Sequence, residues 1–193
     1  MGFKICSYLI NRIKFIYQKI FVKRLKVGFI GLEESGKSTM VYALFENKYR
    51  EDIGSSEVRV SKHIIDNVEI TIYDIPGNQT SQSKWDHYFK KVDVLVFFQS
   101  LIDSPEKIER SREALHGLLY RNMWMKKSLL ILGTKNDLPE AIGCKDLIIQ
   151  LDLVSIVDRE VACYSISSKN MVNVDLVRDW LIEQATLGAE SNM

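Results

Sequence analysis

The chain has 193 residues, enough for one domain with a sizeable buried core, and 46% of them are hydrophobic, as in ordinary globular proteins. Its three cysteines are widely spaced, which argues against a disulfide framework and favours a reducing compartment. The net charge is only +1, but seven Lys or Arg and no acid fall within residues 1–26. A basic arm on an acidic body favours an anionic membrane surface as partner, and not nucleic acid, because the body adds no basic face.

Residues 1–22 are predicted to form an amphipathic helix, because apolar side chains recur every three or four positions from Ile5 to Ile20. Arg12 lies near its centre, so the segment is too charged to span a bilayer. We expect it to lie on a membrane surface, or alternatively to pack on its own domain. Gly2 fits the myristoylation motif incompletely, because Cys6 stands where Ser or Thr is needed; Cys6 itself is either a palmitoylation site or a free thiol.

A phosphate-binding loop is predicted at residues 31–38. A short apolar strand runs into Gly31-Leu-Glu-Glu-Ser-Gly-Lys-Ser38, and a helical stretch follows from Thr39, which is the strand–loop–helix context that this motif requires. Backbone N–H groups of the loop, including those of Glu33, Glu34, Ser35 and Gly36, converge on the phosphates, with the helix N-terminus behind them. Lys37 is expected to reach the β and γ phosphates, and Ser38 to offer its hydroxyl to Mg²⁺.

The remainder alternates strand-like and helix-like patterns, as a doubly wound parallel sheet requires. Val58 and Val60 alternate with polar residues, and Asp66-Asn67 supplies a hairpin turn before the next strand. Two apolar runs are expected to be strands that are buried on both faces. These runs are residues 92–98 and 129–132, the hairpin strand is 68–73, and helices are expected near 105–122, 145–150 and 174–184.

Polar residues that suit a nucleotide follow three of these strands. Asp74 stands at the end of a strand, and Gly77 follows three residues later. P-loop proteins use such a carboxylate and glycine to hold Mg²⁺ and to sense the γ-phosphate. Asp137 can accept two hydrogen bonds from guanine, a pairing that adenine does not offer, and Lys135 can lie over the base. Residues Ser167, Ser168 and Lys169 can present a backbone N–H to the guanine carbonyl.

These residues resemble the motifs of the small GTPase superfamily, and specifically its ADP-ribosylation factor-like branch. The resemblance covers essentially the whole chain, and the stretch Asp158–Ser167 looks most like the subgroup that works on lysosomes and late endosomes. The motifs that carry it are Gly31–Ser38, Asp74–Asn78, Trp85–Phe89, Thr134–Pro139 and Ser165–Lys169, together with the amphipathic N-terminus.

The resemblance implies a P-loop α/β fold, in which a mostly parallel six-stranded sheet carries helices on both faces. It divides the chain into a membrane-binding helix (1–22), a GTPase domain (23–187) and a tail (188–193). It also implies a monomeric GTP/GDP and Mg²⁺ switch that is cytoplasmic and peripheral on endomembranes, with exchange factors, activating proteins and effectors as partners. GTP would slide the hairpin at residues 57–73 and release the N-terminal helix to the membrane.

Four residues depart from the family pattern. Ser55, or Ser56 with a one-residue gap, takes the place of the metal-binding switch threonine, and Pro76 replaces a glycine. Asn78 replaces the glutamine that orients the attacking water, which predicts slow hydrolysis unless Gln79 substitutes for it. Thr134 replaces the guanine-site asparagine, which predicts the loss of a base contact and of a brace for the phosphate loop.

Two other interpretations remain open at this stage. The departures favour a degenerate relative that acts as a non-hydrolysing binding or scaffold protein, whereas the complete phosphate loop argues against it. An ATP-dependent kinase is disfavoured by Asp137 and by the lack of a second substrate domain or lid.

Overall fold

The computed structural model describes residues 22–190 apart from 52, 53 and 55. The predicted N-terminal helix, Gly2, Cys6 and Ser55 therefore lie outside the described residues. The elements, in chain order, are β1 (Lys23–Ile30), α2 (Lys37–Glu46), β2 (Arg59–Ile65), β3 (Val68–Asp74), α3 (Gln79–Gln82), α4 (Trp85–Lys91), β4 (Val94–Ser100), α5 (Pro105–Arg121), β5 (Leu129–Thr134), α6 (Cys144–Gln150), the short 3-10 helix η1 (Leu153–Ser155), β6 (Val161–Ser165) and α7 (Val174–Glu190).

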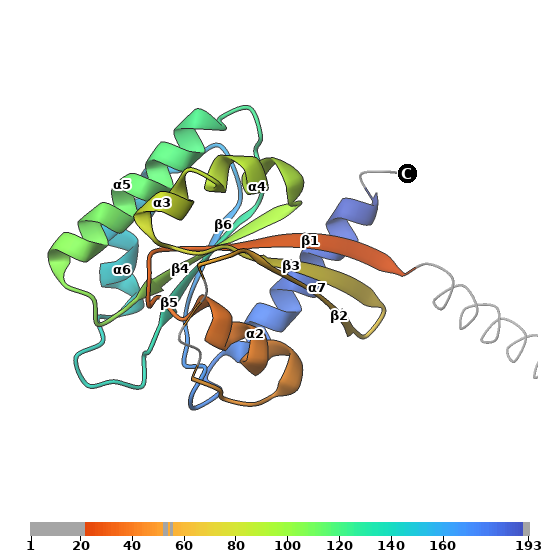
Figure 1. Ribbon diagram of the computed structural model, residues 1–193, viewed down its shortest axis with the longest axis horizontal. Helices are drawn as coiled ribbons and strands as arrows, with labels where there is room; N and C mark the ends of the chain where they lie inside the picture. Colours follow the sequence, from red (N-terminus) through yellow and green to blue (C-terminus); the bar gives the residue numbers. More distant parts are fainter. Residues whose placement is uncertain (1–21, 52–53, 55, 191–193) are drawn as a thin grey trace, which may run out of the picture.

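One six-stranded sheet organises the fold, in the order β2-β3-β1-β4-β5-β6. Only β2 runs antiparallel to its neighbour. Helices cover both faces of the sheet, with α2 and α7 on one side and α3 to α6 on the other (Figure 1). The predicted architecture of a mostly parallel, doubly covered sheet is confirmed.

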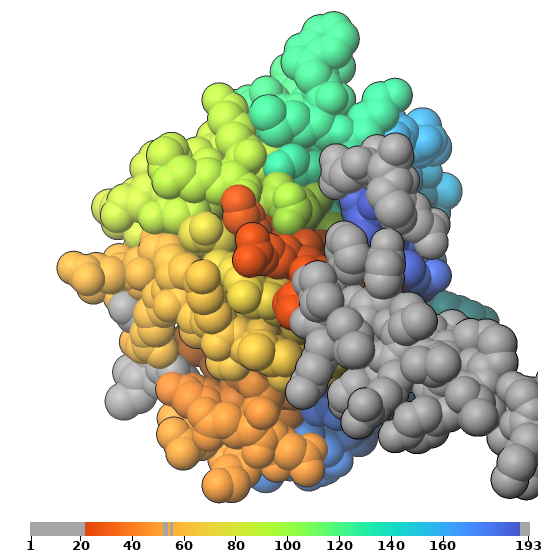
Figure 2. Space-filling model, turned by 90° about the vertical axis from the view of Figure 1, so that its right-hand side faces the viewer, coloured from red at the N-terminus to blue at the C-terminus, as the bar shows by residue number. Residues whose placement is uncertain are grey.

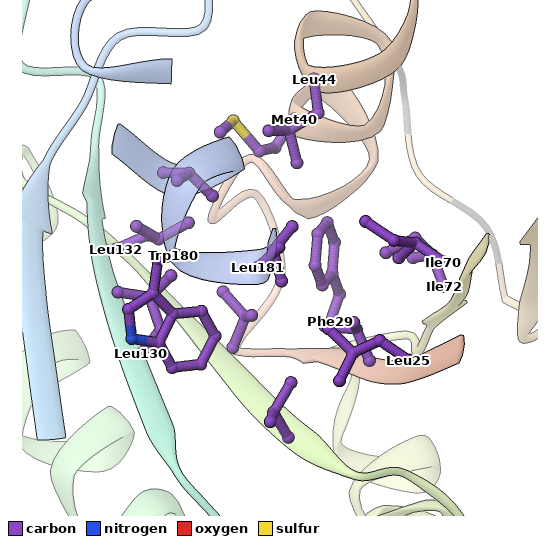
Figure 3. Close-up of a cluster of buried hydrophobic side chains, with 14 of the residues drawn as sticks. Leu25, Phe29, Met40, Leu44, Ile70, Ile72, Leu130, Leu132, Trp180 and Leu181 are labelled. Carbon is purple, nitrogen blue, oxygen red and sulfur yellow. The ribbon is translucent and has the colours of Figure 1, made fainter. Parts of the chain in front are cut away.

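Two hydrophobic cores lie on the two faces of the sheet. In the first, Met40 and Leu44 of α2 and Trp180 and Leu181 of α7 pack on side chains of β1, β3 and β5, as Figure 3 shows with Phe29 at its centre. Every residue of β4 and of β5 is buried, because helices cover both faces of these strands. The two apolar runs therefore form the buried strands that the sequence predicts.

The β2–β3 hairpin turns its most apolar side chains on β2 outward. Its turn at Asp66-Asn67 is as predicted, with Asp66 in the left-handed region at φ 52°. However, Val60 and Ile64 of β2 are 55% and 74% exposed, whereas Ser61 and His63 face the body of the molecule and are half-buried. The alternation predicts a strand correctly, but the apolar side of this edge strand is the outer one.

The parallel arrangement gathers all the chemistry-bearing loops at one edge. Strands β1, β3, β4, β5 and β6 run in the same direction, so the segments that follow Ile30, Asp74, Ser100, Thr134 and Ser165 meet at the carboxyl edge of the sheet. Ligands of open α/β sheets bind in the crevice at this edge.

Candidate functional site: a phosphate loop at the carboxyl edge of the sheet

The phosphate loop is shaped by close backbone packing. Gly31 has φ 144°, and a Cβ added to it would lie 2.3 Å from the Phe98 carbonyl oxygen. A Cβ on Gly77, in the loop after β3, would lie 2.2 Å from the carbonyl oxygen of Gly31. Only glycine fits at either position, so the sequence brings the loop after β3 directly against the phosphate loop.

Lys37 lies at the centre of this loop and is 7% exposed. Its ammonium group donates to the carbonyl oxygens of Gly31 (3.0 Å) and Leu32 (2.8 Å) and to the Ser35 hydroxyl (3.2 Å). Burial lowers the pKa of Lys37 from 10.5 to about 8, with the carboxylate of Asp74 acting in the opposite direction. The loop therefore holds a buried cation that its own carbonyl oxygens pair only partly.

Ser38 and Asp74 form the oxygen-rich part of the site. The Ser38 hydroxyl donates to a carboxylate oxygen of Asp74 at 2.6 Å, although the two residues are 36 positions apart. Both groups are hard oxygen donors, the kind that Mg²⁺ prefers. They suit this ion, and among the described residues no cluster of three or more His, Cys, Asp or Glu forms a separate metal site.

A pocket of about 660 Å³ opens around these groups. It extends from the phosphate loop to the loops after α2 and β3 and to Lys135. Its lining includes most of the predicted phosphate and metal residues, together with Ser56 of the segment before β2. The lining residues are Glu33, Glu34, Ser35, Gly36, Lys37, Ser38, Thr39, Tyr49, Glu51, Gly54, Ser56, Glu57, Asp74, Pro76, Gly77, Asn78 and Lys135.

Motif reasoning missed Tyr49, Glu51, Gly54 and Glu57 of this lining. All four lie in the variable segment between α2 and β2, where the sequence carries no nucleotide-binding pattern apart from its two serines. A composition signal was present nonetheless, because the segment is rich in acids. The rim of the pocket is therefore acidic, whereas its floor carries Lys37.

Asn78 lines the pocket, but its side chain is already engaged. Its amide oxygen accepts the backbone N–H of Ser81 at 2.8 Å and the hydroxyl of Thr80 at 3.1 Å, so it caps the N-terminus of α3. Gln79 is exposed and lies outside this pocket, in the neighbouring hollow between the phosphate loop and α5. The two amides therefore lie in different surroundings, one in a helix cap and the other in the neighbouring hollow.

Thr134, at the end of β5, corrects one expectation. It is 3% exposed, and its hydroxyl donates to the carbonyl oxygen of Ser35 at 3.0 Å. The prediction that this position has lost its brace for the phosphate loop is therefore wrong. Threonine bonds the loop from across the sheet edge, over 99 positions of sequence.

The predicted base-binding residues meet beyond Lys135. The Ser167 hydroxyl donates to Asp137 at 2.7 Å and accepts the backbone N–H of Asn170 at 3.0 Å. Ser168 contacts the sulfur of Met40 at 3.5 Å, and Lys169 is exposed. Two loops that are 30 positions apart are thus tied together around one carboxylate, which has a second oxygen to offer a ligand.

Comparisons with known proteins place this site in a family context. The family model described as the ADP-ribosylation factor family matches residues 13–185. ADP-ribosylation factor-like protein 8c of Arabidopsis thaliana is 35% identical over 171 residues, which cover 86% of this chain and 90% of that protein.

Solved structures resemble the fold more widely. The Arl6 BBS3 small GTPase from Trypanosoma brucei, with the nucleotide analogue GppNp bound, superposes with a TM-score of 0.77 at 19% identity, over 84% of this chain and 98% of that one. A chain from the structure of the mammalian SRP receptor gives a TM-score of 0.74 at 21% identity, over 82% of this chain and 99% of that one.

Proposed function

The chain is a small GTPase of the ADP-ribosylation factor family, and from this premise we propose that it is a membrane-associated switch that binds GTP and GDP in the pocket described above and hydrolyses GTP slowly. The observation that carries the proposal is the assembly of Lys37, Ser38, Asp74 and Gly77 at one end of the pocket. The family membership does not favour the degenerate scaffold.

Phosphate binding follows from the shape of the loop. Backbone N–H groups at the start of α2 and the positive end of its dipole face the pocket. Incoming phosphate oxygens would draw the Lys37 ammonium away from the carbonyl oxygens of Gly31 and Leu32, where it rests at 3.0 and 2.8 Å. Exchanging two neutral carbonyls for anionic oxygens strengthens each hydrogen bond.

Mg²⁺ would be held by the oxygens of Ser38 and Asp74, which already lie 2.6 Å apart. Bound there, the ion would neutralise charge on the phosphates. Ser56 lines the same pocket, and Ser55, the other candidate for the third protein position, lies outside the described residues. Asp74 is 7% exposed, so water does not screen its carboxylate strongly.

Guanine recognition is assigned to Asp137, with Lys135 over the base and the loop at Ser167, Ser168 and Lys169 behind it. Because the Ser167 hydroxyl holds one oxygen of Asp137 at 2.7 Å, the carboxylate is fixed in orientation before the base arrives. Thr134 supports the phosphate end by its bond to Ser35 and is not required to reach the base.

Slow hydrolysis is proposed from Asn78. Its amide oxygen caps α3, so the group that would position the attacking water must give up a cap before it can act. A side chain one methylene shorter than glutamine adds to this deficit. Gln79 is the nearest substitute, and it would have to leave the hollow beside α5.

The membrane part of the proposal rests on the sequence of the N-terminus and on the family. We assign residues 1–22 to a membrane-surface helix, 23–187 to the GTPase domain and 188–193 to a tail. In the part of the chain that the structure describes, no helix is long and apolar enough to cross a bilayer. The resemblance of Asp158–Ser167 suggests late endosomes or lysosomes as the location, with exchange factors, activating proteins and effectors as partners.

The first experiment measures the affinity of the purified full chain for GTP, GDP and ATP with Mg²⁺, followed by single-turnover GTP hydrolysis. Sub-micromolar binding of both guanine nucleotides with slow turnover is the expected result. Binding of only one guanine nucleotide without turnover would support the alternative of a non-hydrolysing scaffold protein. Tighter binding of ATP than of GTP would support the ATP-dependent kinase.

Asp137→Asn is the matched test of base recognition. An amide in place of the carboxylate offers an N–H to the base, so preference should move from guanine to xanthine, which carries a carbonyl where guanine has its amino group. An unchanged preference for guanine would remove Asp137 from the site. Deleting residues 1–20 tests the membrane assignment separately, since it should abolish vesicle binding and leave nucleotide affinity unchanged.

A further inference from the structure

Trp124, in the turn after α5, is the most exposed large hydrophobic residue that the structure describes, at 89%. The chain's other two tryptophans, Trp85 and Trp180, are 1% and 3% exposed. Tyr120 and Met123, on the same turn of chain, are 75% and 47% exposed. Side chains of this size gathered on one surface usually mark an interaction site.

A second segment extends this surface. Val157, in the loop before β6, is 87% exposed. The two loops run side by side, because the Arg159 guanidinium donates to the Met125 carbonyl oxygen at 3.4 Å and the Leu129 N–H donates to Glu160 at 2.9 Å. We call the surface formed by Tyr120, Met123, Trp124 and Val157 the tryptophan edge.

The tryptophan edge lies at the end of the molecule opposite the nucleotide pocket. It precedes β5 and β6, whereas the pocket loops follow the strands. Strand β1 is parallel to these strands and begins at Lys23, so its first residue lies at the same edge of the sheet. Figure 2 shows the start of β1 in red and, above it, the green segment that follows α5, on one face of the molecule.

Charged residues of both signs surround the tryptophan edge, with Lys and Arg in the majority. Lys90 and Lys91 end α4, and Lys126 follows Trp124; all three are exposed. Their elements adjoin, because the Lys127 ammonium donates to the Phe89 carbonyl oxygen at 2.7 Å.

The acidic residues nearby accept hydrogen bonds within the protein, and Asp93, Asp158 and Glu160 are exposed. Asp86 accepts from Arg121 at 3.0 Å, Asp158 from Arg159 at 2.9 Å, and Glu160 from Ser128 at 3.1 Å and Gln184 at 3.0 Å. Asp93 accepts the backbone N–H of Lys26 at 2.7 Å. The surface thus presents aromatic and apolar side chains among charged residues in which Lys and Arg outnumber Asp and Glu.

We propose that the tryptophan edge is a second membrane contact, which inserts Trp124 at the headgroup level of an anionic bilayer while the lysines face the lipid phosphates. Exposed tryptophan and tyrosine beside basic residues are what a bilayer interface selects. The inference rests on the proposed membrane association of the N-terminal arm. It adds that the GTPase domain itself touches the bilayer, with its nucleotide pocket turned away from it.

Tryptophan fluorescence tests this directly, because Trp124 is the one exposed indole among the three. The full chain, loaded with GTP or GDP, is mixed with phosphatidylcholine vesicles with or without phosphatidylserine. On anionic vesicles we expect a blue shift and quenching by brominated acyl chains. Trp124→Ala should lose both signals and weaken vesicle binding roughly tenfold, and Trp124→Phe should retain most of the affinity.

Ile102→Ala is the matched control, since Ile102 is 38% exposed and follows β4 at the opposite edge; it should change neither signal. Vesicle binding without any change at Trp124 would overturn the inference and leave the proposed function intact. A shift that grows with protein concentration in the absence of lipid would assign the surface to self-association instead. If the wild-type chain failed to bind vesicles, both membrane contacts would fall, while nucleotide affinity in the same sample would still report on the switch.

Discussion

At the scale of single residues, the site contains one buried cation, the Lys37 ammonium, where the phosphates of a nucleotide are expected to bind. Lys37 is surrounded by carbonyl oxygens of its own loop, and burial depresses its pKa to about 8. Desolvation disfavours the charged form of a lysine, whereas a phosphate beside it restores that form. Binding of a nucleotide must therefore be linked to the protonation of this side chain.

Nucleotide affinity should fall as the pH rises above about 8. In the nucleotide-free protein Lys37 loses its proton around that pH, whereas the bound form keeps it, so binding takes up a proton between about 8 and the usual lysine range near 10.4. Below pH 8 both states are protonated and the dependence disappears. Calorimetry in two buffers of different ionisation enthalpy should show proton uptake at pH 9 and none at pH 7.

Lys37→Arg is the control, because a guanidinium does not titrate in this range. In this variant only the guanine base of the nucleotide titrates in this range. The difference between the pH dependences of nucleotide affinity in the two proteins therefore reports the titration of Lys37. Equal pH profiles for both would contradict the linkage. The lowered pKa of Lys37 also affects folding. Burial of the ammonium costs stability below about pH 8, and this cost disappears as the pH rises from about 8 to 10.5.

Asn78→Gln should raise single-turnover GTP hydrolysis by about ten- to a hundredfold, because the longer amide can reach the attacking water. The same change removes the α3 cap that Asn78 provides to Ser81 at 2.8 Å, so stability should fall by about 1 kcal/mol. Asn78→Ala loses the cap without gaining reach, and it should lose the same stability with no gain in rate. A rate unaltered by Asn78→Gln would show that another step limits hydrolysis.

At the scale of elements, strands that helices cover on both faces were easier to predict from the sequence than the edge strand. A continuous apolar run must be buried on both faces, so β4 and β5 could be located from composition alone. Alternation in β2 indicates two different faces but does not say which one is covered. The alternation therefore places Val60 in a strand, and only the position of β2 at the edge of the sheet decides that Val60 faces outward.

The site divides in the same way. The phosphate loop consists of eight consecutive residues with a recognisable pattern, so its position could be predicted from the sequence. The bond from Thr134 to Ser35 and that from Ser167 to Asp137 join positions 99 and 30 apart. No local pattern encodes such pairs, since they depend on the strand order. The cap by Asn78 carried a local signal, because Asn is a preferred N-cap residue.

The hairpin offers a matched pair of substitutions. Ile64→Thr changes a side chain that is 74% exposed on β2, whereas Ile70→Thr changes one that is 0% exposed on β3. We expect the first to alter the free energy of unfolding by less than about 0.5 kcal/mol and the second to lower it by about 3 kcal/mol. Urea unfolding at a fixed nucleotide concentration measures both. A large effect of Ile64→Thr would mean that the outer face of β2 is covered in solution.

At the scale of the whole molecule, the fold separates two surfaces of different character. The carboxyl edge of the sheet holds a pocket whose rim carries the exposed carboxylates Glu33, Glu34 and Glu51, and the opposite edge holds lysines and Trp124. An acidic rim is an unusual surrounding for a polyphosphate, and it gives the divalent cation a second task. Mg²⁺ held by Ser38 and Asp74, as proposed, would also offset repulsion between the nucleotide and this rim.

Thermal or denaturant unfolding should therefore be coupled to GDP and to Mg²⁺ together. GDP at a hundred times its dissociation constant should stabilise the native state by about 2.7 kcal/mol, and chelation of Mg²⁺ should remove most of this, because the acidic rim then repels the ligand. Glu33→Gln and Glu51→Gln should each make the stabilisation less dependent on the cation, since each removes one negative charge from the rim. ADP is the control and should stabilise little. If stabilisation by GDP survived chelation of Mg²⁺ in the wild-type chain, the phosphate loop and Lys37 would hold the nucleotide without the cation. Ser38 and Asp74 would then keep their 2.6 Å hydrogen bond to each other in the nucleotide-bound protein.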